Sequence, residues 1–335
     1  MGRIIVDILG CELTSEDRKR IKGEGCAGVI LFARNFENRS QLTALTTEIK
    51  RIKKEPVFVC VDQEGGRVQR FQEGFTRIPP MEVLGTLWDK DQVRACELSQ
   101  DVGIVLGAEL KDVGVHLTFA PVLDINGGNT SVIGDRAFHK DPLAISELGR
   151  YLVRGLTYAG VGAVGKHFPG HGGVIEDTHL DEAIDSREVA EIMAQDVLPF
   201  KVLSSRLSGV MPSHVRYSKF DTQPACFSRQ WLIDILRNDL NFQGLVFSDD
   251  LSMRAAELVG DVASRSRLAI DAGCDFILVC NNSEDADRAL RSISDHRLNN
   301  DQQIMKKMFS TIDMPSFVNT RSDEYKASLS RIEST

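Results

Sequence analysis

Val57-Phe-Val-Cys-Val61 is an uninterrupted apolar run that ends abruptly in the polar tripeptide Asp62-Gln-Glu64. A short run of β-branched and aromatic residues without polar alternation is typical of a strand buried on both faces, as in a parallel sheet. Polar residues at the carboxyl end of such a strand are candidates for function, because α/β proteins place their sites there. The sequence therefore predicts a buried parallel strand that leads into a site.

The same kind of run recurs seven more times along the chain. These runs are Ile4–Ile8, Val29–Phe32, His116–Leu123, Ala163–Phe168, Gly209–His214, Leu245–Ser248 and Phe276–Cys280. Each gap between them has room for a helix and two loops, and several gaps have helical periodicity, as in 98–113. Eight strand–helix units predict a (β/α)8 barrel, an α/β fold, with a doubly wound open sheet as the alternative.

We expect a single domain. The barrel is predicted to span residues 1–299, and no linker rich in Pro, Gly or Ser divides it. Residues 300–335 are polar with mixed charge, and they are predicted to form a helical or loosely ordered C-terminal tail.

Composition excludes several classes of protein. Lys and Arg total 40 against 48 Asp and Glu, a net charge of −8, so the broad basic surface of nucleic-acid binders is missing. The N-terminal apolar run is too short for a signal peptide, and no apolar stretch is long enough to span a membrane. The seven cysteines are scattered without a C-x-x-C pair. We expect a cytoplasmic protein with no nucleic-acid or membrane partner.

Polar side chains, most of them ionisable or amide groups, follow most of the predicted strands. They are Arg34 and Asn35; Asp62, Gln63 and Glu64; Asp124 and Asn126; Lys166, His167 and His171; Ser213 and His214; Asp249 and Asp250; Asn281 and Asn282. A barrel gathers the loops at the carboxyl ends of its strands on one rim. Any one of these residues could instead cap a helix, but their convergence predicts a functional site.

The histidines permit a second interpretation, a metal site. Four possible ligands fall in one short segment: His167, His171, Asp177 and His179. Pro169 and Gly170 break the helix that would place the first two histidines on one face. Metal-assisted hydrolysis is therefore the runner-up, and we expect the protein to need no metal and no organic cofactor.

A carboxylate and a histidine pair point to glycoside hydrolysis. No G-x-S-x-G motif supports a serine hydrolase. Asp249 ends a predicted buried strand, and an Asp-x-His pair, Asp177 and His179, lies in a loop after another strand. Glycosidases need one group that attacks the anomeric carbon and another that protonates the leaving oxygen. A histidine with a pKa of about 6.5 can give and then take that proton.

Six motifs place these residues in a longer pattern. They are Asp62-Gln-Glu-Gly-Gly-Arg-Val-Gln-Arg70, Phe119-Ala-Pro-Val-Leu-Asp124, Gly134-Asp-Arg136, Lys166-His-Phe-Pro-Gly-His-Gly172, Asp177-Thr-His179 and Phe247-Ser-Asp-Asp-Leu-Ser252. With these motifs the chain resembles the bacterial cytoplasmic β-N-acetylhexosaminidases of glycoside hydrolase family 3, the single-domain enzymes of peptidoglycan recycling. The resemblance runs from about residue 3 to residue 282.

The resemblance implies roles for individual residues. It implies a retaining mechanism with Asp249 as nucleophile and with His179, oriented by Asp177, as general acid/base. The pocket for a terminal N-acetylglucosamine would be lined by Asp62, Arg70, Arg136, Lys166 and His167, and His214 would line it too or support Asp249. Thr178 replaces the serine usual in the family's Asp-Ser-His triplet.

The resemblance also implies a substrate class. It predicts an exo-acting β-N-acetylglucosaminidase that acts on muropeptide fragments, especially those that end in 1,6-anhydro-N-acetylmuramic acid. We expect a monomer, although the sequence does not determine the oligomeric state. A catalytically silent sugar-binding barrel is the alternative from a different class. The sequence leaves open the aglycone preference and whether water or phosphate accepts the sugar.

Overall fold

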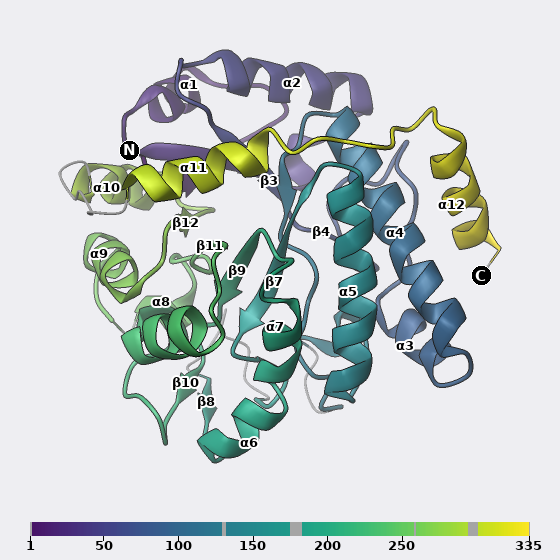
Figure 1. The fold of residues 1–335 in the computed structure, drawn as a ribbon. Coiled ribbons are helices and arrows are strands. Elements are labelled where there is room, and N and C mark those ends of the chain that lie inside the picture. The colour runs from purple at the N-terminus through teal and green to yellow at the C-terminus, as the bar shows by residue number, and fades with distance from the viewer. Residues whose placement is uncertain (1, 129–131, 175–182, 258, 294–300, 335) are drawn as a thin grey trace.

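The protein folds as a closed barrel of parallel strands (Figure 1). The computed structural model describes residues 2–128, 132–174, 183–257, 259–293 and 301–334. The sheet order is β11-β9-β7-β6-β3-β2-β1-β12, and a parallel bridge between Phe247 and Phe276 joins its two edges. The strands are β1 (Ile4–Val6), β2 (Cys26–Leu31), β3 (Phe58–Val61), β6 (Leu117–Thr118), β7 (Gly162–Phe168), β9 (Gly209–Pro212), β11 (Leu245–Val246) and β12 (Ile277–Val279). The predicted (β/α)8 barrel is confirmed, and each predicted run overlaps one strand.

Helices surround the strands. They are α1 (Ser15–Lys22), α2 (Arg39–Arg51), α3 (Glu82–Trp88), α4 (Gln92–Asp112), α5 (Pro142–Tyr158), α6 (Val189–Ala194), α7 (Val197–Leu203), η4 (Gln230–Asp239), α8 (Arg254–Glu257), α9 (Val262–Ala272), α10 (Ser283–Ser292), α11 (Asp301–Ile312) and α12 (Asp323–Glu333). Among the residues described, none of these helices has both the length and the apolarity to cross a bilayer.

Side-chain caps explain where several helices begin. The side chains of Thr14, Asn38, Asp91, Asp141 and Asp261 each accept a backbone N–H from the first turn of the following helix. Such a bond satisfies a donor that has no partner inside the helix. Asp91 starts α4 at Gln92, ahead of the predicted 98–113 segment.

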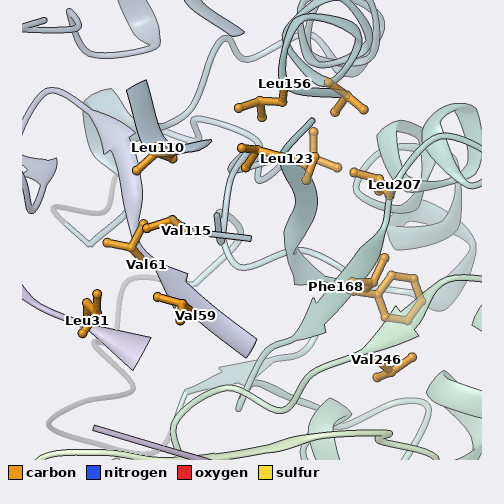
Figure 2. Packing of buried hydrophobic residues seen from close by; sticks show 14 of the residues in the cluster. Leu31, Val59, Val61, Leu110, Val115, Leu123, Leu156, Phe168, Leu207 and Val246 are labelled. Atoms are coloured by element: carbon orange, nitrogen blue, oxygen red, sulfur yellow. The ribbon is translucent and has the colours of Figure 1, made fainter. Parts of the chain in front are cut away.

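The side chains of each strand alternate between two parts of the core. In β3, Phe58 and Cys60 belong to the cluster inside the barrel, whereas Val59 and Val61 belong to the cluster between strands and helices (Figure 2). Inside the barrel, the Phe58 ring makes edge-to-face contacts with Phe247 and Phe276. These rings fill the interior, so the site lies at the rim and not in a channel.

The C-terminal segment packs against the barrel. In α11, Ile304 and Met308 join the cluster inside the barrel. The helix α12 lies beside α4 (Figure 1), where Arg331 forms an ion pair with Asp101 at 2.6 Å. The two helices thus add to both parts of the core.

Two short strand pairs lie outside the barrel sheet. The hairpin of β4 (Gln63–Gly65) and β5 (Val68–Gln69) follows β3 directly. The parallel pair of β8 (Ile184–Asp185) and β10 (Arg216–Tyr217) joins segments that follow β7 and β9. Both pairs therefore shape the rim at the carboxyl ends of the strands.

Candidate active site

A pocket of about 550 Å³ opens at the carboxyl ends of the strands. Its wall includes side chains that follow β2, β3, β7, β11 and β12, others from the β4–β5 hairpin, and Arg136 from the short turn Gly134–Arg136 after β6. They are Phe32, Asp62, Glu64, Arg67, Arg70, Arg136, Lys166, His167, His171, Asp249, Asp250 and Asn281. Apolar residues, among them Ile30, Val68, Met211 and Met253, complete it. A mixed wall of this kind suits a sugar, which has polar hydroxyls and apolar ring faces.

Buried ion pairs organise one side of the pocket. The Nζ of Lys166 lies 2.7 Å from Asp62 Oδ1 and 2.7 Å from Glu64 Oε1. The guanidinium of Arg136 donates two hydrogen bonds to Glu64, at 2.8 and 2.9 Å. Arg70 Nη2 reaches Asp62 Oδ2 at 3.5 Å. Asp62, Arg70, Arg136 and Lys166 therefore form one connected network with Glu64.

Glu64 is the hub of this network. Its side chain is only 3% exposed, and burial alone would raise its pKa. The Lys166 ammonium and the Arg136 guanidinium outweigh burial and hold the pKa of the Glu64 carboxyl well below its usual range. The sequence contains a signal for this role, since Glu64 stands two residues after Asp62 and alternate side chains of extended backbone share a face.

A second buried pair orients His167. The Nδ1 of His167 lies 2.6 Å from Asp124 Oδ2, and Asp124 Oδ1 accepts the backbone N–H groups of His167 and His171 at 3.1 and 2.7 Å. Although burial opposes it, His167 lowers the pKa of Asp124. Because Nδ1 is committed to the carboxylate, Nε2 is the ring nitrogen left for the pocket. The role of Asp124 follows from contacts between β6 and β7, which the sequence pattern does not reveal.

Asp249 stands at the end of β11, in the wall of the same pocket. Its Oδ1 accepts the backbone N–H of Asp250 at 2.8 Å. The preceding Ser248 is completely buried, and its Oγ accepts the backbone N–H of Leu278 at 3.0 Å. The strand end that carries Asp249 is thus tied to β12, which limits the directions in which the carboxylate can point.

His214 lies apart from the other predicted site residues. Its side chain is 1% exposed and does not line the pocket. The Nε2 lies 3.0 Å from the backbone carbonyl of Asp250, and the ring stacks on Phe227. Burial lowers the pKa of His214, but Cys226 and Asp249 outweigh it and raise the pKa to about 9. Of the two roles considered for His214, the geometry favours support of the Asp249 segment.

Asp177 and His179 lie outside the described residues. The segments on either side are described, and an ion-pair cluster joins the downstream segment to the start of α7. Arg187 lies 2.7 Å from Asp185 and 2.9 Å from Asp196, the residue before α7. The hydroxyl of Tyr217 donates to the carbonyl of Gly170. These contacts hold both flanks of the segment at the rim.

Other strand-end residues have structural contacts. Asn282 caps α10 by accepting the backbone N–H of Asp285 at 3.1 Å. The amide of Asn35 donates to the carbonyls of Ile8 and Gly10. These two side chains therefore have structural roles: Asn282 caps a helix and Asn35 holds a loop.

Of the four possible metal ligands, His167 and His171 are among the described residues, and Asp177 and His179 are not. In the described ranges, no three side chains of His, Cys, Asp or Glu form a group with ligand geometry. His167 and His171 are both described, and their rings meet edge to face with centroids 5.8 Å apart. The Nδ1 of His167 is already bound to Asp124.

Glu64→Gln is expected to destabilise the protein by about 3–5 kcal/mol at neutral pH, because it leaves two buried cations without their shared anion. It should also reduce kcat/KM by about 10²-fold, since Lys166 and Arg136 lose their positions. Urea unfolding and steady-state kinetics check both effects.

The pH dependence of this destabilisation has a definite sign. The folded-state pKa of Glu64 is lowered, so its contribution is present above the unfolded pKa, about 4.3, and is lost as the pH falls. The gap between wild type and variant should therefore shrink in acid. Glu48→Gln, at a surface ion pair with Arg18, is the matched control and should cost less than about 1 kcal/mol. Equal costs for the two variants would contradict the hub role.

The sequence matches the family model described as the glycosyl hydrolase family 3 N terminal domain over residues 4–310. A beta-hexosaminidase from Bordetella avium is 49% identical over 295 residues, which cover 88% of this chain and 84% of that protein. A beta-hexosaminidase from Thiobacillus denitrificans is 49% identical over 294 residues, which cover 88% and 82%.

Solved structures show the same similarity. NagZ from Neisseria gonorrhoeae, in complex with N-trifluoroacetyl-D-glucosamine, superposes with a TM-score of 0.92 at 40% identity and covers 99% of this chain and 97% of its own. A glycoside hydrolase family 3 beta-N-acetylglucosaminidase from Paenibacillus superposes with a TM-score of 0.88 at 29% identity, and the match covers 98% of this chain and 66% of that one.

Proposed function

This chain belongs to glycosyl hydrolase family 3, where it is a glycosidase of the beta-hexosaminidase kind, and we propose that it is a retaining exo-β-N-acetylglucosaminidase. One observation carries the proposal. The Asp249 carboxylate shares a pocket of about 550 Å³ with the donors of Arg70, Arg136 and Lys166. A carboxylate at one end of a sugar-sized, donor-lined pocket suits attack on an anomeric carbon.

The proposed reaction has two steps. Asp249 attacks C1 of the terminal sugar while His179, oriented by Asp177, protonates the departing glycosidic oxygen. This step breaks the glycosidic bond and forms a covalent ester between C1 and the Asp249 carboxylate. In the second step His179 removes a proton from water, which attacks C1 and releases the sugar with the β configuration retained.

The remaining pocket residues are proposed to bind the sugar. Asp62 offers carboxylate oxygens to hydroxyl groups, and the cationic side chains and His167 Nε2 face the same space. A buried donor left unpaired by a wrong sugar costs free energy, so this wall provides selectivity. A relative has been solved with N-trifluoroacetyl-D-glucosamine, which supports an N-acetylated sugar as the ligand.

We further propose muropeptide fragments as substrates, with the reaction serving peptidoglycan recycling in the cytoplasm. The relatives named NagZ support the substrate class. All seven cysteines are free thiols, as expected in a reducing compartment. The silent sugar-binding barrel is the competing function, and turnover distinguishes the two.

The test is release of nitrophenol from the aryl N-acetyl-β-glucosaminide, run beside the β-glucoside and repeated with chelator. We expect turnover of the N-acetyl sugar only, with no effect of chelator. The anomer formed first, followed by proton NMR, should be β. Loss of activity with chelator would restore the metal mechanism, and absence of turnover on either sugar would favour the silent barrel.

A further inference from the structure

Asp250 follows the proposed nucleophile directly, and its side chain turns toward β12. Its Oδ1 accepts two backbone N–H groups, from Ser252 and Cys280, each at 3.0 Å. Its Oδ2 lies 2.7 Å from the hydroxyl of Ser252, which in turn lies 2.7 Å from the carbonyl oxygen of Cys280. These four contacts join the end of β11 to the end of β12.

The hydrogen atoms available to the series Asp250–Ser252–Cys280 indicate whether Asp250 is protonated. The carbonyl of Cys280 can only accept a hydrogen bond, so its contact needs the single hydroxyl hydrogen of Ser252. An ionised Asp250 would need the same hydrogen for its Oδ2. If Oδ2 carries a proton, it donates to Ser252 Oγ, and Ser252 donates to Cys280. Every contact then has its own hydrogen.

We propose that Asp250 is a positioning residue that, in mildly acidic solution, holds a proton while its neighbour Asp249 is ionised, so that the turn carries one negative charge, on the nucleophile. This inference rests on the proposed role of Asp249. The proton sits on Oδ2, at the start of the chain Asp250–Ser252–Cys280. Two adjacent ionised carboxylates would repel each other and raise the pKa of the nucleophile.

The charged groups around the turn fit this assignment. Among the described residues, the charged side chains that hydrogen-bond to the turn or to the adjoining end of β12 are Asp249 itself; His214 from the end of β9, at the Asp250 carbonyl; Asp7 from the end of β1, at the N–H of Asn281; and Arg265 from α9, at the Leu251 carbonyl. The cations contact backbone carbonyls, whereas the Asp250 carboxyl contacts only Ser252 and Cys280 among the described residues. Burial and Asp249 raise the pKa of Asp250 to about 6.

The hydrogen bonds of protonated Asp250 to Ser252 and Cys280 position the nucleophile through the backbone. The backbone N–H of Asp250 donates to Asp249 Oδ1 at 2.8 Å. The side chain of Asp250 fixes that N–H by anchoring the turn to Cys280. Asp250 thus acts through Asp249 and has no direct part in bond breaking.

The first experiment measures the proton itself. Infrared difference spectra of the full chain, wild type minus Asp250→Asn, should contain the band of a protonated carboxyl group at pH 5, and the band should fade as the pH rises through about 6. Asp112→Asn, at an exposed ion pair, is the matched control and should remove only carboxylate bands. A wild-type spectrum with carboxylate bands alone at Asp250 would overturn the proposal, whatever the enzymatic activity.

The second experiment measures stability and rate. A raised folded-state pKa stabilises the protein below the unfolded pKa, and that stabilisation is lost as the pH rises through about 6. The urea midpoint of wild type should therefore fall over this range relative to Asp250→Asn, whose amide hydrogen replaces the proton. Parallel midpoints for the two proteins would contradict the assignment.

The rate comparison uses two substitutions at the same position. At pH 5, where the wild-type side chain holds its proton, Asp250→Ala should reduce kcat/KM by about 10²-fold, and Asp250→Asn should recover most of that loss. An asparagine variant as slow as the alanine variant would show that the negative charge, not the proton, is needed. If neither the wild type nor any variant turns over the aryl substrate, the proposed function fails. The infrared spectra and the urea midpoints still decide whether Asp250 is protonated.

Discussion

Asp249→Asn is expected to reduce turnover of the aryl N-acetyl-β-glucosaminide by on the order of 10³-fold or more. An amide oxygen is a poor nucleophile, so the covalent ester with C1 cannot form at a useful rate. The substitution is nearly isosteric, and its Oδ1 can still accept the Asp250 N–H that Asp249 accepts at 2.8 Å. The fold should therefore persist, which circular dichroism and urea unfolding check.

The control for this variant is a second Asp→Asn change far from the pocket. Asp112 lies at the end of α4 in an exposed ion pair with Arg39, and Asp112→Asn should keep wild-type kinetics. Mass spectrometry of wild type during slow turnover should show a protein carrying one sugar, and the Asp249 variant should not. Activity that persists in Asp249→Asn would move the nucleophile elsewhere, with Asp250 the first residue to test.

His179→Ala should have an effect that depends on the leaving group. Removal of a general acid costs about 10²- to 10⁴-fold when the departing oxygen needs a proton. A sugar leaving group needs that proton, whereas a nitrophenolate departs readily without it. We therefore expect a large loss on disaccharide substrates and a much smaller loss in the glycosylation of Asp249 by aryl glycosides. Initial rates on both substrates, measured with the same enzyme preparation, check the difference.

His139→Ala is the matched control for this change. His139 lies outside the pocket wall and contacts Asp89 at 3.3 Å, so its loss should slow both substrates little and equally. Equal large losses on both substrates for His179→Ala would contradict the acid role. Asp177→Asn should reproduce the His179 pattern in weaker form, because it removes the charge proposed to stabilise the imidazolium.

The barrel could be predicted because the burial of each strand determines the residues of that strand alone. A strand buried on both faces needs apolar side chains at nearly every position, and that need is visible in each of the eight runs. The ends of the strands were less predictable. The run His116–Leu123 contains only Leu117–Thr118 as regular strand. Pro121 has no N–H to give to a ladder, and beyond it the segment pairs with β7 through an isolated bridge between Val122 and Lys166.

The site could be predicted as a set of residues at one rim, but not as a network. Asp62, Arg70, Arg136, Lys166 and His167 line the same pocket as Asp249. The position of His214 behind this pocket depends on how β9 sits against the Asp249–Asp250 turn. No local pattern contains that information, because the two segments are 36 residues apart.

The amino-acid sequence alone was enough to locate the buried apolar strands, to count the strand–helix units and to list the chemical groups at the rim. The pairing of these groups became known from the tertiary structure: Glu64 with Lys166 and Arg136, Asp124 with His167, and Asp250 with the backbone of Cys280. An apolar run is a property of a single segment, so neighbouring residues are enough to reveal it. Pairing and protonation depend on distances and burial between segments far apart in the chain, and these exist only once the barrel has closed.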